Sequence, residues 1–289
     1  MQILVTGGAG YIASNLIKSL KQKFPECEII SLDNYTSGFE SNHVEGVKYI
    51  RGNTWDISKI DQIQKFHPKY VFHLGEFSRI VLSFKKPNET FQSNSYGTQQ
   101  ILNYCIEKNA KLIYSGSSAI FGNNGEDKNL NPYAWTKGTN IFLIKNYANW
   151  FGLDYAIVYF YNVFGKNHIT QGEYATVIGI FEKQYKNNEP LTIVEPGLQT
   201  RSFTHIDDIV KGIIIVAEKG SGDEYYLSSK NDISILDIAK MFNHPYIFIE
   251  KKRGERTSSE IKISRAETEL GWKADIQISD YIKDISKYK

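Results

Sequence analysis

The chain of 289 residues has only two cysteines, Cys27 and Cys105, and its six histidines are scattered along the sequence. Two cysteines provide no disulfide framework and are typical of a protein kept reduced, so a cytoplasmic location is expected. The sequence contains no H-x-x-x-H or C-x-x-C motif, which are common spacings of zinc ligands. We therefore predict no metal site.

Long hydrophobic runs and a marked excess of charge are also absent. No apolar stretch approaches the roughly 20 residues that cross a bilayer, and "MQILVTGGAG" lacks the basic region and apolar core of a signal peptide. The formal net charge is +2, so charge alone indicates neither a nucleic acid nor a membrane as partner. Hydrophobic residues make up 41% and charged residues 23%, as in ordinary globular proteins.

Short β-branched runs alternate with helical patterns in the first 160 residues. Strands are expected at residues 2–6, 27–33, 47–50, 69–74, 110–115 and 154–160, and longer helices at 10–23, 88–108 and 132–151. This alternation predicts an α/β fold of Rossmann type with a doubly wound parallel sheet. We expect residues 1–165 to form this domain. Residues 166–289 are expected to form a small mixed α/β lobe that is interleaved with it.

The segment "VTGGAGYIASNL" (5–16) places Gly7, Gly8 and Gly10 between the first strand and the first helix. Glycines at this turn let backbone amides approach a pyrophosphate at the start of the helix. An acid, Asp33, ends the second strand, where it can accept hydrogen bonds from the adenosine ribose and would repel a 2′-phosphate. The pattern predicts a dinucleotide site that prefers NAD to NADP, so residues 1–165 are the expected NAD-binding domain and residues 166–289 the expected substrate lobe.

Seven motifs occur together along nearly the whole chain. They are "TGGAGYI" (6–12), "VFHLGEFS" (71–78), "NSYGT" (94–98), "YSGSSAIFG" (114–122), "NPYAWTK" (131–137), "YNVFG" (161–165) and "RSFTHIDD" (201–208). In this order they resemble the extended short-chain dehydrogenase/reductases that act on nucleotide sugars, and most of all the 4-epimerases and 4,6-dehydratases. The resemblance implies an enzyme with NAD as cofactor and a nucleotide sugar as substrate.

The pattern Y-x-x-x-K occurs three times, at Tyr104/Lys108, Tyr133/Lys137 and Tyr226/Lys230. The resemblance selects Tyr133 and Lys137 as catalytic residues that also contact the cofactor. It implies that Ser117 is the third catalytic residue and that its hydroxyl also binds the substrate. Pro132 marks a helix start, so one helical turn places Tyr133 and Lys137 on one face. The ammonium and an oxidised nicotinamide would favour the phenolate, which makes Tyr133 a general base. We interpret the other two pairs as accidental.

Further site residues are implied by the resemblance alone. Besides Gly7, Gly10 and Asp33, the expected cofactor contacts are Tyr11, Ile12, Asn34, Asn53, Thr54, Leu74, Gly75 and Asn94. The expected substrate contacts are Arg79, Asn162, Arg201, Arg253 and Ser259. Lys252 and Arg256 compete with Arg253 for a phosphate contact, and a solvated basic loop is the alternative for this cluster. Ser259 is expected beside the sugar's 2-substituent, where a serine leaves space for an N-acetyl group.

The residues after Ser117 decide between reactions. The dehydratases of this family follow the active-site hydroxyl with an acid pair, whereas this chain has Ser118 and Ala119. We therefore predict a 4-epimerase of UDP-hexose or UDP-N-acetylhexosamine type that works through a 4-keto sugar. A 4,6-dehydratase, a 4-dehydrogenase and a non-catalytic NAD-binding regulatory protein are the alternatives. Glu76 and Arg79 are expected either to pair with each other or to touch the sugar, and Glu76 is the one nearby acid that could serve a dehydratase.

The two long helices expected at 88–108 and 132–151 resemble those that form a four-helix interface in this family. A homodimer is therefore expected.

Overall fold

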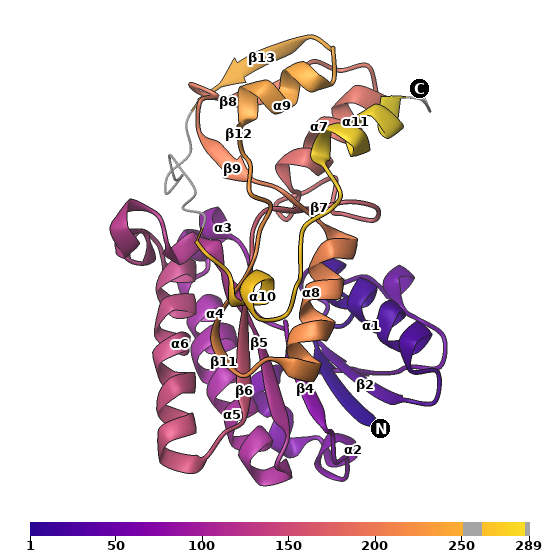
Figure 1. Cartoon of the computed structure of the whole chain (residues 1–289), viewed down its shortest axis with the longest axis vertical. Coiled ribbons are helices and arrows are strands. Elements are labelled where there is room, and N and C mark those ends of the chain that lie inside the picture. Colours follow the sequence, from indigo (N-terminus) through magenta and orange to yellow (C-terminus); the bar gives the residue numbers. More distant parts are fainter. Residues whose placement is uncertain (251–261, 287–289) are drawn as a thin grey trace.

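A parallel sheet of seven strands forms the centre of the larger lobe (Figure 1). The computed structural model describes residues 1–250 and 262–286. The strands lie in the order β11-β6-β5-β4-β1-β2-β3, and each neighbouring pair is parallel. Their bounds are β1 Gln2–Thr6, β2 Glu28–Asp33, β3 Lys48–Arg51, β4 Tyr70–His73, β5 Lys111–Ser117, β6 Tyr155–Phe160 and β11 Gly222–Leu227. The predicted Rossmann-type sheet is thus confirmed, with its order reversing between β1 and β4.

Helices cover both faces of this sheet, which explains why its strands read as continuous apolar runs. In β1, for example, Ile3, Leu4 and Val5 are all fully buried. On one face α1 (Tyr11–Lys23) packs beside α8 (Ile206–Lys219). On the other face lie α5 (Gly97–Lys108) and α6 (Pro132–Phe151).

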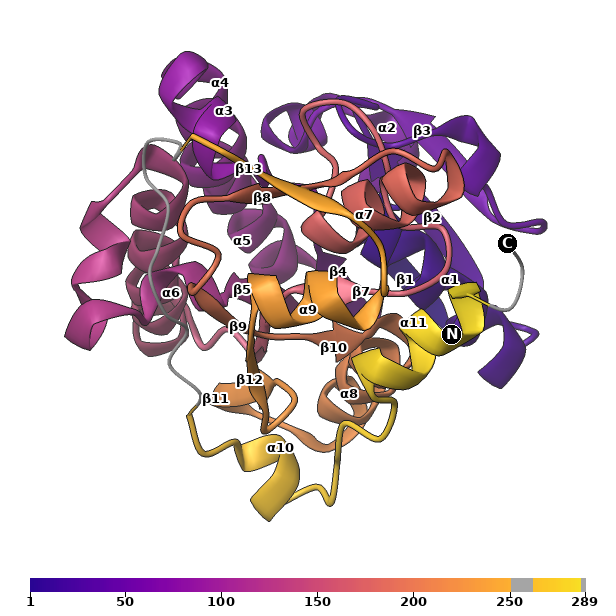
Figure 2. The ribbon, with the colours of Figure 1, turned by 90° about the horizontal axis from the view of Figure 1, so that it is seen from above.

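A smaller lobe lies above the upper edge of the sheet in Figure 1 and over its middle in Figure 2. It has its own apolar core. Its elements are α7 Val177–Lys186, β8 Leu191–Val194, β9 Thr200–Ser202, β12 Asp232–Ser234, α9 Ile235–Met241, β13 Tyr246–Ile249 and α11 Ile278–Ser286. The chain returns to the larger lobe with α8 and β11, so the two lobes are interleaved in sequence. The division into residues 1–165 and 166–289 stays a prediction.

Two short strands, β7 (Val163–Phe164) and β10 (Thr204–His205), lie between the two lobes, while α10 (Arg265–Thr268) packs against β11 of the larger lobe. β7 and β10 pair in parallel, which ties the segment leaving β6 to the segment entering α8. The walls of the space between the lobes are thereby held by backbone hydrogen bonds.

The helix expected at residues 88–108 is divided. It consists of α4 (Pro87–Phe91), a π-helical segment (Gln92–Tyr96) and α5. The wider π turn inserts an extra residue and turns Ser93 and Asn94 into the protein interior. Two short helices, α2 (Asp61–Gln64) and α3 (Ile80–Lys85), were not expected. Within residues 1–250 and 262–286, no helix is both long and apolar enough to cross a membrane.

Candidate functional site

A cavity of about 900 Å³ lies between the sheet and the smaller lobe. Its wall contains Gly7 after β1, Leu74 after β4 and Ser117 at the end of β5, joined by Thr176 and Arg201 from the smaller lobe. The carboxyl ends of parallel strands, beside the point where strand order reverses, are the usual ligand site of this architecture. The volume suits a ligand of cofactor or substrate size.

The glycine turn at the start of α1 is shaped for close approach. Gly7 has φ +73°, and a Cβ there would lie 2.8 Å from the Cα of Gly75, so a side chain would push the β1 and β4 loops apart. Gly10 precedes α1 and provides no side-chain cap. The first amides of this 13-residue helix are therefore available to an anion, as a pyrophosphate requires.

The Asp33 carboxylate lies on the same cavity wall. It accepts hydrogen bonds from the backbone N–H groups of Ala9 (2.9 Å) and Tyr35 (2.7 Å). Burial raises the pKa of Asp33 by more than these two hydrogen bonds lower it. Thr54 also lines the cavity, and its buried hydroxyl makes no hydrogen bond within the described part of the chain. The turn and the acid fit NAD.

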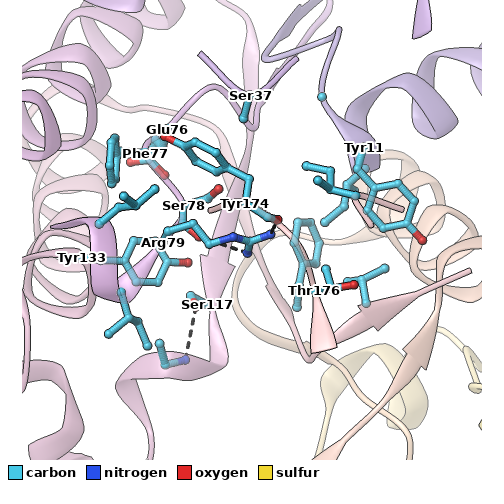
Figure 3. Close-up of a pocket in the computed structure, with 18 of the residues that line it drawn as sticks. Tyr11, Ser37, Glu76, Phe77, Ser78, Arg79, Ser117, Tyr133, Tyr174 and Thr176 are labelled. Carbon is cyan, nitrogen blue, oxygen red and sulfur yellow. Dashed lines mark hydrogen bonds between the residues drawn. The ribbon is translucent and has the colours of Figure 1, made fainter. Parts of the chain in front are cut away.

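The first turn of α6 presents Tyr133 and Lys137 to the cavity. Asn131 caps the helix because its Oδ1 accepts a hydrogen bond from the Ala134 N–H at 2.8 Å, and Pro132 occupies the first helical position. Ser117, at the end of β5, faces the same space (Figure 3). The three predicted catalytic side chains are thus brought together.

The two other tyrosine–lysine pairs lie away from this cavity. The Tyr104 hydroxyl donates to the carbonyl oxygens of Ile63 and Phe66 at 3.0 and 3.1 Å. Tyr226 stacks on Tyr159 with ring centroids 5.0 Å apart. Both tyrosines pack in the core, which agrees with their interpretation as accidental matches.

Glu76 binds Lys137 in the protein interior. The side chains are 1% and 5% exposed, and the ammonium also donates to the Ser115 carbonyl oxygen at 2.6 Å. Glu76 Oε1 accepts hydrogen bonds from Thr98 Oγ1 (2.8 Å), Tyr114 OH (3.1 Å) and Asn140 Nδ2 (2.9 Å). The carboxylate is therefore fully engaged on the core side of the cavity wall.

Of the two alternatives for Glu76 and Arg79, their pairing with each other is wrong. Arg79 donates to the Tyr174 carbonyl oxygen and, more weakly, to the Ser78 carbonyl oxygen at 3.4 Å. The physical reason is that Glu76 meets a nearer cation, Lys137, on the core side, whereas Arg79 caps α3 on the cavity side.

The remaining predicted residues fall into three groups. Tyr11, Ile12, Asn34, Leu74, Gly75, Asn162 and Arg201 line the cavity. Asn53 and Asn94 do not: Asn53 accepts a hydrogen bond from Asn34 Nδ2 at 3.2 Å, and Asn94 is fully buried. Arg253 and Ser259, with the cluster 251–256, lie outside the described residues.

Sequence reasoning missed the partners of Glu76. Thr98, Tyr114 and Asn140 come from α5, β5 and α6, and only Asn140 carried a signal, since it lies three residues beyond Lys137 and so on the same helical face. His73 extends the network, with its ring nitrogens 2.7 Å from Thr6 Oγ1 and 2.9 Å from Thr98 Oγ1.

Comparison with known proteins accords with this geometry. Residues 3–227 match the model of the NAD dependent epimerase/dehydratase family. A Methanocaldococcus jannaschii protein named "Putative UDP-glucose 4-epimerase" is 30% identical, with 98% of this chain and 96% of that protein aligned. The dTDP-D-glucose 4,6-dehydratase of Dictyostelium discoideum is also 30% identical, over 83% of this chain and 61% of that protein.

Among solved structures, the UDP-glucose 4-epimerase of Thermotoga maritima superposes with a TM-score of 0.92 at 24% identity, covering 100% of this chain and 98% of the other. That likeness shows the shared fold. The family match extends over most of the chain and includes the glycine turn and the Tyr133–Lys137 helix. The chain therefore belongs to the NAD-dependent epimerase/dehydratase family, whose members here include enzymes of nucleotide sugars.

Proposed function

We propose that the protein is a nucleotide-sugar 4-epimerase of UDP-hexose or UDP-N-acetylhexosamine type that works through a 4-keto sugar. The observation that carries this proposal is the convergence of Tyr133, Lys137 and Ser117 on the cavity beside the glycine turn. Tyr133 takes the proton of the sugar 4-hydroxyl, and Ser117 hydrogen-bonds to the same oxygen. NAD, when held by the glycine turn and Asp33, would supply the redox chemistry that interconverts the 4-hydroxyl and the 4-keto group.

The protein's own contribution is position and proton transfer. Tyr133 lies in the first turn of α6 and lines the cavity. The Lys137 ammonium one turn later adds a positive charge on the same face. Glu76 and the Ser115 carbonyl oxygen hold that ammonium in one position.

Two features favour epimerisation over dehydration. Removing water across C5 and C6 needs an acid and a base beside the sugar, yet Ser118 and Ala119 follow Ser117. Glu76, the nearest acid after β4, has one oxygen on Lys137 and the other on three donors. It is therefore not directed at the sugar.

The decisive experiment is incubation of the purified protein with a panel of UDP-, dTDP- and GDP-sugars, with products identified by NMR. Epimers at C4 are the expected products. A 4-keto-6-deoxy sugar would instead identify a dehydratase, and net NADH formation with an accumulated 4-keto sugar a dehydrogenase.

Replacement of the base provides a matched test. Tyr133→Phe should lower turnover by about 10²–10⁴-fold and leave NAD binding intact, because only the acid–base hydroxyl is lost. Tyr104→Phe is the control, since that hydroxyl bonds core carbonyl groups far from the cavity. Near-normal turnover in Tyr133→Phe would assign the base to another residue.

A homodimer is part of the proposal. Large apolar side chains are exposed on α4, the π-helical segment and α6, namely Phe91, Tyr96, Trp135, Phe142, Trp150 and Phe151. A patch of this kind is typical of a surface that a second copy covers. Light scattering after size exclusion should give twice the mass of 33.1 kDa.

Both cysteines are buried thiols, in accord with a cytoplasmic enzyme.

A further inference from the structure

The Arg79 side chain reaches into the cavity beside the proposed base. In Figure 3 it lies between Tyr133 and Tyr174 and faces the same space as Ser117. Its position is set by the backbone, because Arg79 is the residue that precedes α3 in the loop after β4. The guanidinium is thus held at the sugar end of the cavity, where Tyr133 must meet the 4-hydroxyl.

This guanidinium has no acidic partner among the described residues. Its hydrogen bonds go to the neutral carbonyl oxygens of Tyr174 and Ser78, its carbon Cζ lies 5.9 Å from the centre of the Tyr174 ring, and its Nε is buried without a hydrogen bond. Burial also lowers the pKa of Arg79. A desolvated cation with an unused N–H group is costly, and an anion that reaches it recovers that cost.

The acids on the cavity wall are all engaged elsewhere. Glu76 binds Lys137, and Asp33 accepts two backbone N–H groups. Glu173 pairs with Lys85 at 2.9 Å, and Glu89 pairs with Lys86 at 3.1 Å. Within residues 1–250 and 262–286, none of these four carboxylates forms an ion pair with Arg79, which leaves the cation open to an anion carried by a ligand.

We propose that Arg79 binds a carboxylate on the sugar ring, so that the substrate is a nucleotide-linked acidic sugar such as a hexuronate. This inference rests on the proposed 4-epimerase reaction. With the 4-hydroxyl at Tyr133, the neighbouring ring carbon, C5, brings a carboxylate to Arg79, whereas the diphosphate leaves from C1 on the opposite side of the ring. The N–H groups of the two Nη atoms that do not bind Tyr174 or Ser78 can donate to a carboxylate, whose charge matches the guanidinium as a hydroxymethyl group does not.

The test uses substrate pairs that differ only at C6. Binding of UDP-glucuronate and UDP-glucose, and of GDP-mannuronate and GDP-mannose, is measured by calorimetry on NAD-loaded Tyr133→Phe protein, and turnover on NAD-loaded wild-type enzyme. The acidic member of at least one pair should bind about 10- to 100-fold more tightly, the gain expected from hydrogen bonds between two charged groups. Arg79→Met should abolish that preference and leave the neutral sugar bound as before.

Arg201→Met is the matched control on the opposite wall and should weaken both members of a pair equally. Equal weakening of both by Arg79→Met would assign Arg79 to the diphosphate and overturn the proposal. So would neutral sugars that bind the wild-type cavity as tightly as acidic ones in both series, a comparison that needs no folded variant. Selective binding of the acid without any epimer formed would instead count against the proposed reaction alone.

Discussion

Removal of the Glu76 carboxylate should destabilise the protein strongly, because it leaves a buried ammonium unpaired. In Glu76→Ala, Lys137 keeps only oxygen atoms of Ser115, and Thr98, Tyr114 and Asn140 lose a common acceptor. Breaking a buried ion pair by removing one partner costs about 3–5 kcal/mol. An unfolding entropy of roughly 2.1 cal/mol/K per residue over 289 residues gives about 0.6 kcal/mol per kelvin, so the melting temperature should fall by about 5–8 °C.

The assay is thermal and urea unfolding of the NAD-loaded protein, with Glu40→Gln as control. Glu40 pairs with Arg51 at 3.0 Å, but the two side chains are 72% and 63% exposed, and such pairs contribute about 0–1 kcal/mol. The double change Glu76→Leu with Lys137→Met should recover part of the loss, since apolar residues can replace the ion pair but leave Thr98, Tyr114 and Asn140 without their acceptor. A shift in Glu76→Ala no larger than that of the control would refute this account of the network.

Three further predictions concern other parts of the site. Burial lowers the pKa of His73 to about 4, whereas the pKa of the unfolded residue is near 6.5. Between these two pH values His73 is protonated in the unfolded chain and neutral in the folded protein. Stability is therefore fully present above pH 6.5 and falls by about 1.4 kcal/mol per unit as the pH drops towards 4; urea unfolding should show this slope in wild type and lose it in His73→Gln. Asp33 should make the enzyme prefer NAD to NADP, and Asp33→Asn should narrow that preference in fluorescence titration; a wild-type preference for NADP would contradict the role of this acid. Ser259→Tyr should abolish turnover of N-acetylhexosamine nucleotides while sparing plain hexose ones, and equal loss on both would show that Ser259 does not gate the pocket.

The elements of the larger lobe were predictable because each strand is a short apolar run bounded by turn residues. The expected strand at residues 2–6 is β1, and the expected helix at 132–151 is α6. The π-helical segment Gln92–Tyr96 was not predictable, since a single inserted residue leaves the apolar spacing of the helix nearly unchanged. Its effect on the site is direct, because it turns Asn94 inward.

Contacts between distant residues were beyond the sequence. Tyr133 and Lys137 are four positions apart on one helix, so local geometry places them together. Glu76 and Lys137 are 61 positions apart, and only the packing of β4 against β5 and α6 brings them into contact. The sequence also does not show whether a charged residue after a strand faces the core or the cavity. It therefore could not predict that Glu76 faces the core and Arg79 the cavity.

The loop of residues 74–79 supplies both the buried acid that binds Lys137 and the arginine that reaches the cavity. Asn94 holds its middle by accepting a hydrogen bond from the Phe77 N–H at 2.6 Å and donating to the Phe77 carbonyl oxygen at 3.1 Å. With Phe77 fixed in this way, Glu76 points to Lys137 in the core, and Arg79 reaches the cavity before α3 begins. Asn94 also donates to Thr136 Oγ1 at 3.0 Å, next to Lys137 on α6. The π turn that buries Asn94 therefore couples the loop that holds Arg79 to the helix that holds Tyr133, and so fixes the separation between the proposed carboxylate site and the proposed base.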